Sequence, residues 1–228
     1  MTDFEDPFGS SVALARWAAG ILRAQGIDRI SKWRMLEYWM QVELYRAVID
    51  NKAGGWRYVG DHEQPYHTDV PLSNRKSEAK WVDLLLAEPN PKSPKRLVWV
   101  ELKDVGRSEH PLKANAAGLG HDLAALYGLN PPKSKKLWLE PHASRVDKGR
   151  VKEWEAYAAV LDCDGHLIAQ TVLVPKDLLQ RHAKMIVDTW LQEFEKRAKV
   201  SPLSHKITIE RGDTEQFAIF ALVSRLRG

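Results

Sequence analysis

Apolar positions along the chain recur at two spacings, one typical of helices and one typical of strands. Helical spacing predicts four helices, over residues 11–25, 31–50, 112–127 and 177–199. Short apolar runs predict strands over residues 56–59, 80–86, 96–103, 136–140, 157–162, 167–174, 207–209 and 217–222. Polar residues with two prolines make 62–77 a predicted loop. This order predicts a mixed α/β fold with a mainly antiparallel or mixed sheet.

Turn-forming residues divide these elements from one another. Gly54 and Gly55 are expected to stop the helix at 31–50, and three prolines within 88–95 separate two of the strands. The strands at 80–86 and 96–103 are therefore expected to form an antiparallel hairpin with a long loop. Asp164-Gly165 predicts a tight hairpin turn between 157–162 and 167–174.

Charged residues interrupt the two strands of the first hairpin. Because side chains alternate along a strand, Glu101 and Lys103 share one face, while Val98, Val100 and Leu102 point to the other face and the core. Paired strands lie about 4.8 Å apart. In a suitable register, Asp83 of the first strand would converge with Glu101 and Lys103 on one patch.

Such a patch destabilises the fold unless a partner compensates its charges. A charge in an apolar strand is unfavourable without a partner, and two adjacent carboxylates repel each other. A divalent cation removes that penalty, and one or two carboxylates with several retained waters suit Mg²⁺. Lys103 beside them would orient or deprotonate a water molecule, or stabilise charge that develops on a phosphate. This is the equipment for metal-assisted hydrolysis of a phosphodiester.

Asp83, followed after 17 residues by Glu101-Leu102-Lys103, resembles the PD-(D/E)xK motif of restriction-endonuclease-like nucleases. Val82 stands where the motif usually has its proline. The family core is a helix, three strands, a helix and a fourth strand, which the predicted elements from 31 to 140 match in order. The resemblance implies a nuclease-like core at 31–140, a helical segment at 1–30 before it, and a C-terminal α/β extension of the same domain at 141–228.

The resemblance also implies roles for individual residues. Asp83 and Glu101 would bind the metal with help from the carbonyl of Leu102, and Lys103 would act on the attacking water. The family often adds a glutamate from its first helix; Glu43 is our candidate for this further metal-site residue and Glu37 the second choice. The basic and polar residues expected to contact nucleic acid are Lys80, Lys92, Lys95, Arg96, Lys113 and His121.

Composition narrows the chemistry and the compartment. The single cysteine, Cys163, excludes an internal disulfide and any cysteine-cluster metal site within one chain, which leaves oxygen ligands as the main route to metal chemistry. The start of the chain is acidic where a signal peptide is basic, and the apolar runs are far shorter than a membrane span. A cytoplasmic protein is expected. The formal charge of +4 is only weak evidence for a nucleic-acid partner.

The predicted function is therefore Mg²⁺-dependent hydrolysis of phosphodiester bonds, with Mn²⁺ as a substitute and DNA expected ahead of RNA. Endonuclease and exonuclease activity both stay open, as does a homodimer; no membrane partner is expected. The alternative is a non-catalytic module on a nuclease-like fold that binds nucleic acid or another protein. An HD-type phosphohydrolase around His121 and Asp122 is disfavoured, because the surrounding elements are strands.

Overall fold

The chain folds into a mixed α/β structure. The computed structural model describes residues 6–29, 36–59, 64–71, 79–89, 94–105, 112–139, 155, 158–202 and 207–226. Its helices are α1 (Ser11–Ala24), the short 3₁₀ helix η1 (Ile27–Arg29), α2 (Leu36–Ile49), α3 (Leu112–Tyr127), α4 (Pro131–Leu139) and α6 (Lys176–Ala198). Its strands are β1 (Arg57–Tyr58), β2 (Gln64–His67), β3 (Ala79–Val82), β4 (Leu84–Ala87), β5 (Arg96–Asp104), β6 (Gly165–Pro175), β7 (Glu210–Asp213) and β8 (Phe217–Arg225).

Six of these strands form one mixed sheet in the order β1-β4-β5-β6-β8-β7, and β2 and β3 form a separate two-stranded sheet. All pairs in the large sheet are antiparallel except β5 and β6, which run parallel over their whole overlap. A parallel pair needs a crossover connection, and α3 and α4 lie in the segment between β5 and β6. The predicted mixed α/β class and mixed sheet are confirmed.

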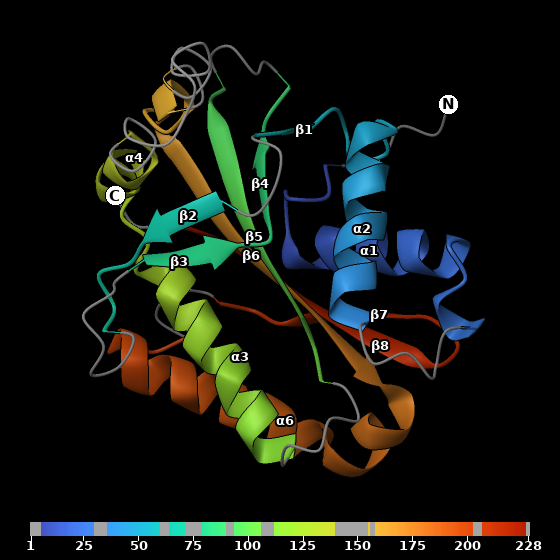
Figure 1. The fold of residues 1–228 in the computed structure, drawn as a ribbon. Helices are drawn as coiled ribbons and strands as arrows, with labels where there is room; N and C mark the ends of the chain where they lie inside the picture. Colours follow the sequence, from blue (N-terminus) through green and yellow to red (C-terminus); the bar gives the residue numbers. More distant parts are fainter. Residues whose placement is uncertain are drawn as a thin grey trace.

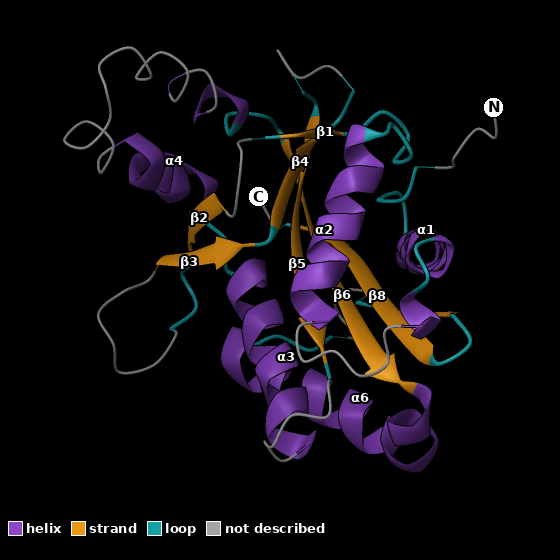
Figure 2. Ribbon diagram, turned by 45° about the vertical axis from the view of Figure 1, so that its right-hand side comes forward, coloured by secondary structure: helices purple, strands orange, loops and turns teal. Residues whose placement is uncertain are grey.

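Helices cover both faces of the large sheet (Figures 1 and 2). α1 and α2 lie on one face, and α3 and α6 lie on the other. The β5 side chains alternate between the two resulting cores: Val98, Val100 and Leu102 belong to the first, and Leu97 and Trp99 to the second. The alternation predicted for this strand is confirmed, but both of its faces are buried, which explains the continuous apolar run from Leu97 to Val100.

Three of the predicted helices agree closely with the structure. α1 begins after Ser10, whose hydroxyl accepts a hydrogen bond from the backbone N–H of Ala13 and so caps the helix. α3 has the predicted bounds, and α6 ends at Ala198, followed by Lys199 in the left-handed conformation common after helix ends. The glycines were expected to stop α2, but the helix ends at Ile49 and Asn51 makes the stop: it has a positive φ angle, and the Lys52 N–H donates to the Ala47 carbonyl. Gly54 and Gly55, also with positive φ angles, lie in the turn that follows.

The strand predicted at 136–140 is wrong, because residues up to Leu139 belong to α4. The side chain of Asn130 accepts a hydrogen bond from the backbone N–H of Lys133 and caps this helix, and Pro131 occupies its first position. Both residue types are favoured at helix starts. Trp138 is fully buried and its indole N–H donates to the carbonyl of Pro65.

The hairpin predicted around Asp164-Gly165 is also wrong. Residues 158–160 are helical, and Gly165 opens β6, which pairs with β5 and β8. A Cβ atom at this glycine would lie 2.7 Å from the carbonyl oxygen of Lys95. The glycine therefore serves the close approach of two strands, and no turn between neighbouring strands forms here.

Two other strand predictions need smaller corrections. The run at 80–86 is divided at Asp83 into β3 and β4, and β2 lies inside the predicted loop at 62–77. The last strand pair exists, but its first strand is β7 instead of 207–209, so that Arg211-Gly212-Asp213 lie in a strand and not in the turn. The C-terminal third, whose role the sequence left open, supplies β6, β8 and β7 to the large sheet and α6 to its cover.

Candidate active site

The candidate active site lies where the chain passes from the small sheet into the large one, between β3 and β4 (Figure 1). β4 starts at Leu84, which pairs with Val100 of β5, whereas β3 ends at Val82 and pairs with β2. Asp83 is the one residue between these two strands. β5 continues past Val100 to Asp104 with β6 along its other side. Residues 101–104 therefore extend beyond β4, and Asp83 lies next to the start of this extension.

Hydrogen bonds fix Asp83 at both ends, its side chain to β5 and its backbone carbonyl to α2 and β1. Its carboxylate oxygen Oδ2 accepts a bond of 2.6 Å from the backbone N–H of Leu102. Its carbonyl oxygen accepts bonds from Gln41 Nε2 on α2, at 3.2 Å, and from the hydroxyl of Tyr58, at 3.4 Å. The residue is 9% exposed. The predicted convergence of Asp83 with the Glu101-Leu102-Lys103 segment is present in the structure.

Glu101 is buried beside Asp83, with 6% of its surface exposed. Its Oε1 lies 3.0 Å from Lys103 Nζ, while its Oε2 is buried and has no hydrogen-bond partner within the described residues. Burial raises the pKa of Glu101 well above its usual value, and the negative charge of Asp83 raises it further against the opposing effect of Lys103. A cation near Oε2 would satisfy this oxygen and favour the ionised form.

Lys103 is held between two carboxylates. Its Nζ lies 3.0 Å from Glu101 Oε1 and 3.0 Å from Oε1 of Glu37, in the first turn of α2. Burial lowers the pKa of Lys103, but the charges of Glu101 and Glu37 outweigh burial and raise it above its usual value. In this arrangement the side chain is a firmly charged ammonium group, suited to neutralising negative charge more than to removing a proton.

A second ion pair borders the site on the side of α3. Lys80 Nζ of β3 lies 2.5 Å from Asp122 Oδ1 of α3. Tyr66 of β2 is buried nearby: burial raises its pKa, and the charges of Glu101, Asp122 and Asp83 raise it further. In total the carboxyl groups of Asp83, Glu101, Glu37 and Asp122 face the two ammonium groups of Lys80 and Lys103. The carboxyl groups outnumber the ammonium groups, so a bound cation would balance the charge of the cluster.

The acidic side chains do not make a complete metal centre by themselves. No group of three or more His, Cys, Asp and Glu side chains in the described part of the chain could hold a metal ion together. Mg²⁺ needs less than this, because it commonly binds one or two carboxylates and keeps several waters. The unpartnered Glu101 Oε2 beside Asp83 fits that requirement.

The two helix glutamates considered from the sequence differ in their surroundings. Glu43 is buried on the inner side of α2, where its Oε1 lies 3.1 Å from Arg46 Nη1 and its Oε2 has no partner within the described residues. Glu37, the second choice, is the one that reaches Lys103. The hydrophobic pattern of α2 could not separate them, because this helix is apolar on nearly every side.

Two of the residues expected to contact nucleic acid lie at the far end of β5. Arg96 opens that strand, five residues before Glu101, which at about 3.3 Å per residue separates them by roughly 16 Å. Its guanidinium lies 2.9 Å from Glu88 and 3.2 Å from Asp6. Lys95 is exposed beside it. Lys92 lies outside the described residues.

The other three residues proposed for nucleic-acid contact are nearer to α3. Lys80 is engaged with Asp122, as described above. His121 is half-buried, and burial lowers its pKa, followed by the positive charges of Lys80 and Arg197, so its ring is neutral at neutral pH. Lys113 is exposed and lines a groove between α3 and α6.

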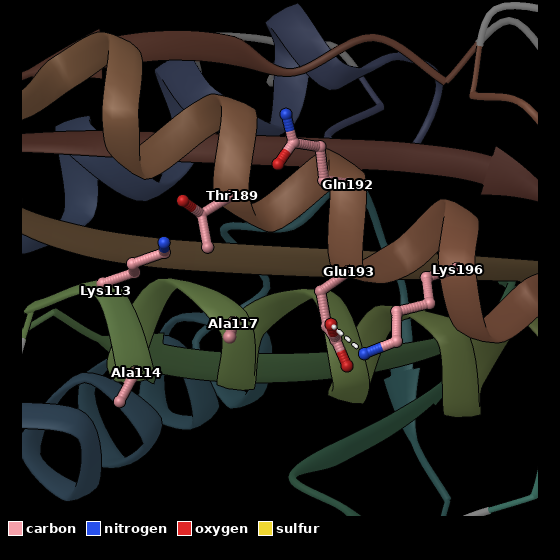
Figure 3. Close-up of a pocket in the computed structure, with 7 residues that line it drawn as sticks. All are labelled: Lys113, Ala114, Ala117, Thr189, Gln192, Glu193 and Lys196. Atoms are coloured by element: carbon pink, nitrogen blue, oxygen red, sulfur yellow. Dashed lines mark hydrogen bonds and ion pairs between the residues drawn. The ribbon is translucent and has the colours of Figure 1, made fainter.

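That groove has a volume of about 530 Å³ and is shown in Figure 3. Its lining residues are Lys113, Ala114, Ala117, Thr189, Gln192, Glu193 and Lys196. None of them belongs to the cluster around Glu101, and the carboxylate of Glu193 already pairs with Lys196 and Arg197. The groove is therefore separate from the candidate active site.

Comparisons with known proteins add nothing to this geometry. No family model matches the chain, and no match is found among curated proteins or solved structures. Within the described residues, no helix combines the length and the apolar character that crossing a membrane requires.

Proposed function

We propose that the protein is a metal-dependent nuclease that hydrolyses phosphodiester bonds in nucleic acid, DNA ahead of RNA. The observation that carries this proposal is the bond from the Leu102 N–H to Asp83 Oδ2. It draws one buried carboxylate towards a second, that of Glu101, which keeps an unpartnered oxygen. Lys103 completes the set of an acid pair and an ammonium group in one place.

The order of the elements supports the proposal. The PD-(D/E)xK core that the motif resembles consists of a helix, three strands, a helix and a fourth strand. α2, β1, β4, β5, α3 and β6 follow this order, with Asp83 directly before the second strand and Glu101 and Lys103 in the third. The fourth strand is β6, in place of the residues near 136 that the sequence suggested.

Each residue of the cluster has its own role in the proposed hydrolysis. Asp83 and Glu101, with the carbonyl of Leu102, would hold Mg²⁺ or Mn²⁺. The cation supplies Lewis acidity towards the phosphate oxygens. Lys103 neutralises the charge that develops on the phosphoryl group and orients the attacking water by hydrogen bonding. Glu37 positions Lys103 through their ion pair of 3.0 Å.

Exposed aromatic side chains support a nucleic acid as the substrate. Trp81 is 59% exposed and stands two residues before Asp83. Tyr38 is 61% exposed and follows Glu37 directly. Nucleobases of any kind can stack on such side chains. Trp81 and Tyr38 would therefore offer two stacking surfaces, each close in sequence to a residue of the proposed chemistry.

A non-catalytic nucleic-acid-binding module is the second candidate. One observation favours it: within the described part of the chain, no three acidic or imidazole side chains gather to hold a metal. In such a module the ion pairs of Lys103 and Lys80 would be purely structural, and nucleic acid would bind at the same aromatic side chains without being cleaved.

Cleavage assays test the proposal. Wild-type protein is incubated with single- and double-stranded DNA and RNA in Mg²⁺, Mn²⁺ or a chelator, beside Asp83→Asn and Lys103→Met. The matched controls are Asp188→Asn and Lys184→Met, which alter an exposed ion pair on α6. We expect metal-dependent cleavage that falls at least about 100-fold in the two site variants and is unchanged in the controls. Binding without cleavage by the wild type would favour the second candidate.

A further inference from the structure

Gln170 is a fully buried polar residue directly beside Glu101. β5 and β6 run parallel, and in their register Glu101 is the partner of Gln170. Partners in neighbouring strands project to the same face of a sheet, with their strands about 4.8 Å apart. The exposed fraction of Gln170 is 0%, so its amide group is enclosed by the protein.

The orientation of the Gln170 amide is fixed by α3. Its Nε2 donates a hydrogen bond of 3.1 Å to the backbone carbonyl oxygen of Leu119. Because a carbonyl oxygen can only accept, the nitrogen and not the oxygen of the amide must face Leu119. The amide oxygen Oε1 therefore points away from that carbonyl, and it has no hydrogen-bond partner within the described residues.

Two unpartnered buried oxygens thus occupy registered positions on adjacent strands: Glu101 Oε2 and Gln170 Oε1. Buried polar atoms are almost always satisfied in folded proteins, so two neighbouring exceptions indicate a shared partner. Both atoms are oxygens with lone pairs, and only a cation or a hydrogen-bond donor can serve them together. Hard divalent cations take carboxylate and carboxamide oxygens alike.

We propose that Gln170 is a further ligand residue of the divalent cation site, its Oε1 acting with the carboxylates of Asp83 and Glu101. The inference rests on the proposed function only for the presence of the cation. It assigns a role to β6, the strand that carries none of the residues of the recognised motif. It also explains why the acidic side chains alone fall short of a metal centre, since the missing oxygen comes from a neutral amide.

Cation binding by the whole chain, in the absence of nucleic acid, tests this inference. Mn²⁺ affinity is measured by calorimetry or electron paramagnetic resonance for the wild type, Gln170→Met and Gln170→Glu. Methionine has a similar length without the oxygen, and glutamate restores an oxygen at the same place. The control is Thr171→Val, because Thr171 is the next residue, is equally buried, and has an unpartnered hydroxyl.

We expect Gln170→Met to weaken Mn²⁺ binding by about tenfold or more, and Gln170→Glu and Thr171→Val to retain it. Thermal unfolding without metal identifies the competing explanation, a direct hydrogen bond from a neutral Glu101 to Gln170. Under that explanation Gln170→Met melts earlier without metal and keeps wild-type Mn²⁺ affinity, which overturns the inference. A wild type that does not bind Mn²⁺ overturns it as well.

The outcomes separate this inference from the proposed function. If the wild type binds Mn²⁺ through Gln170 but cleaves no nucleic acid, the cation site stands and the nuclease proposal fails. If the wild type cleaves nucleic acid and Gln170→Met keeps full Mn²⁺ affinity, the nuclease proposal stands and the role of Gln170 is refuted.

Discussion

Lys80 of β3 and Asp122 of α3 form an ion pair of 2.5 Å that fastens the small sheet to the helix covering the large one. Their side chains are 23% and 18% exposed. In a double-mutant cycle with Lys80→Met and Asp122→Asn, we expect a coupling free energy of about 1–2 kcal/mol in urea unfolding. The exposed pair Lys184 and Asp188 should give about 0.5 kcal/mol or less. Equal coupling free energies in the two pairs would show that the Lys80–Asp122 pair adds no more stability than an exposed one.

Gly120 sets the distance between α3 and α6. A Cβ atom at this position would lie 2.8 Å from the backbone nitrogen of Phe194 and 2.9 Å from Cβ of Glu193, so the helices would have to separate. We expect Gly120→Ala to lower the free energy of unfolding by about 1–3 kcal/mol.

Gly118, on the same helix, provides the matched control for Gly120. No atom lies within 4 Å of a Cβ added there. Gly118→Ala should therefore raise the free energy of unfolding by about 0.5–1 kcal/mol through helix propensity alone. Chemical denaturation of both variants measures the difference, and changes of the same sign would refute the close packing of the two helices.

Asp28 makes part of the stability depend on acid pH. Burial raises the pKa of its carboxyl group, but hydrogen bonds from the Thr214 hydroxyl and from the N–H groups of Gln216 and Glu215 outweigh burial and lower it below the usual 3.8. A lowered pKa in the folded state stabilises the protein above the unfolded pKa, and this contribution disappears as the pH falls through the folded value.

The comparison for Asp28 is therefore with Asp28→Asn across pH. Wild type should exceed the variant by up to about 1 kcal/mol in free energy of unfolding near neutral pH, because its bonds to a charged acceptor are stronger but are partly screened by solvent. The difference should shrink below pH 3.8 and vanish at lower pH. A difference that stays constant with pH would show that the charge of Asp28 plays no part.

Glu37 and Glu43 are expected to behave differently in catalysis. Glu37→Gln removes one of the two carboxylates that position Lys103. On the proposed mechanism, in which the ammonium group acts on the reacting phosphate, kcat should fall about tenfold with little change in KM. Glu43→Gln, on the same helix, should leave kcat within about twofold, since its visible partner is Arg46. Steady-state cleavage kinetics measure both effects. A larger fall in kcat for Glu43→Gln than for Glu37→Gln would favour Glu43 as the metal-site residue of this helix.

Trp81 is expected to stack on a nucleobase. Trp81→Ala should weaken binding of a single-stranded oligonucleotide by about 1–3 kcal/mol, and Trp81→Phe should retain much of the affinity. Ile49→Ala is the control, because Ile49 is an exposed apolar residue at the far end of α2. Fluorescence anisotropy in the presence of a chelator measures binding without cleavage. Loss of affinity in the control but not in Trp81→Ala would place the nucleic acid elsewhere.

Local sequence patterns were sufficient to predict part of the candidate site. The approach of Asp83 to Glu101 follows from side-chain alternation and from a hairpin between strands that are neighbours in sequence, and both can be read directly. The strand predicted at 136–140 is wrong because five residues are too few to separate the helical from the strand periodicity.

The pairing of strands that are distant in the chain could not be predicted from the sequence. Gln170 comes to Glu101 only through the parallel register of β5 and β6, which no local pattern encodes. The choice between Glu37 and Glu43 depends on how α2 is rotated on the sheet, and an evenly apolar helix does not reveal that rotation. Asp122 was noticed as a polar residue, but its partner Lys80 was assigned to nucleic acid instead.

The extension of β5 beyond β4 also bears on solubility. A strand edge without a neighbour is a template on which another chain can add a strand, and such edges begin aggregation. Here the extension carries Glu101, Lys103 and Asp104, while its Leu102 N–H is occupied by Asp83. Among the described residues no strand pairs with this side of 101–104, and Lys103 and Asp104 are only partly buried there. Because charges on a strand edge discourage such addition, we expect these two residues also to oppose self-association.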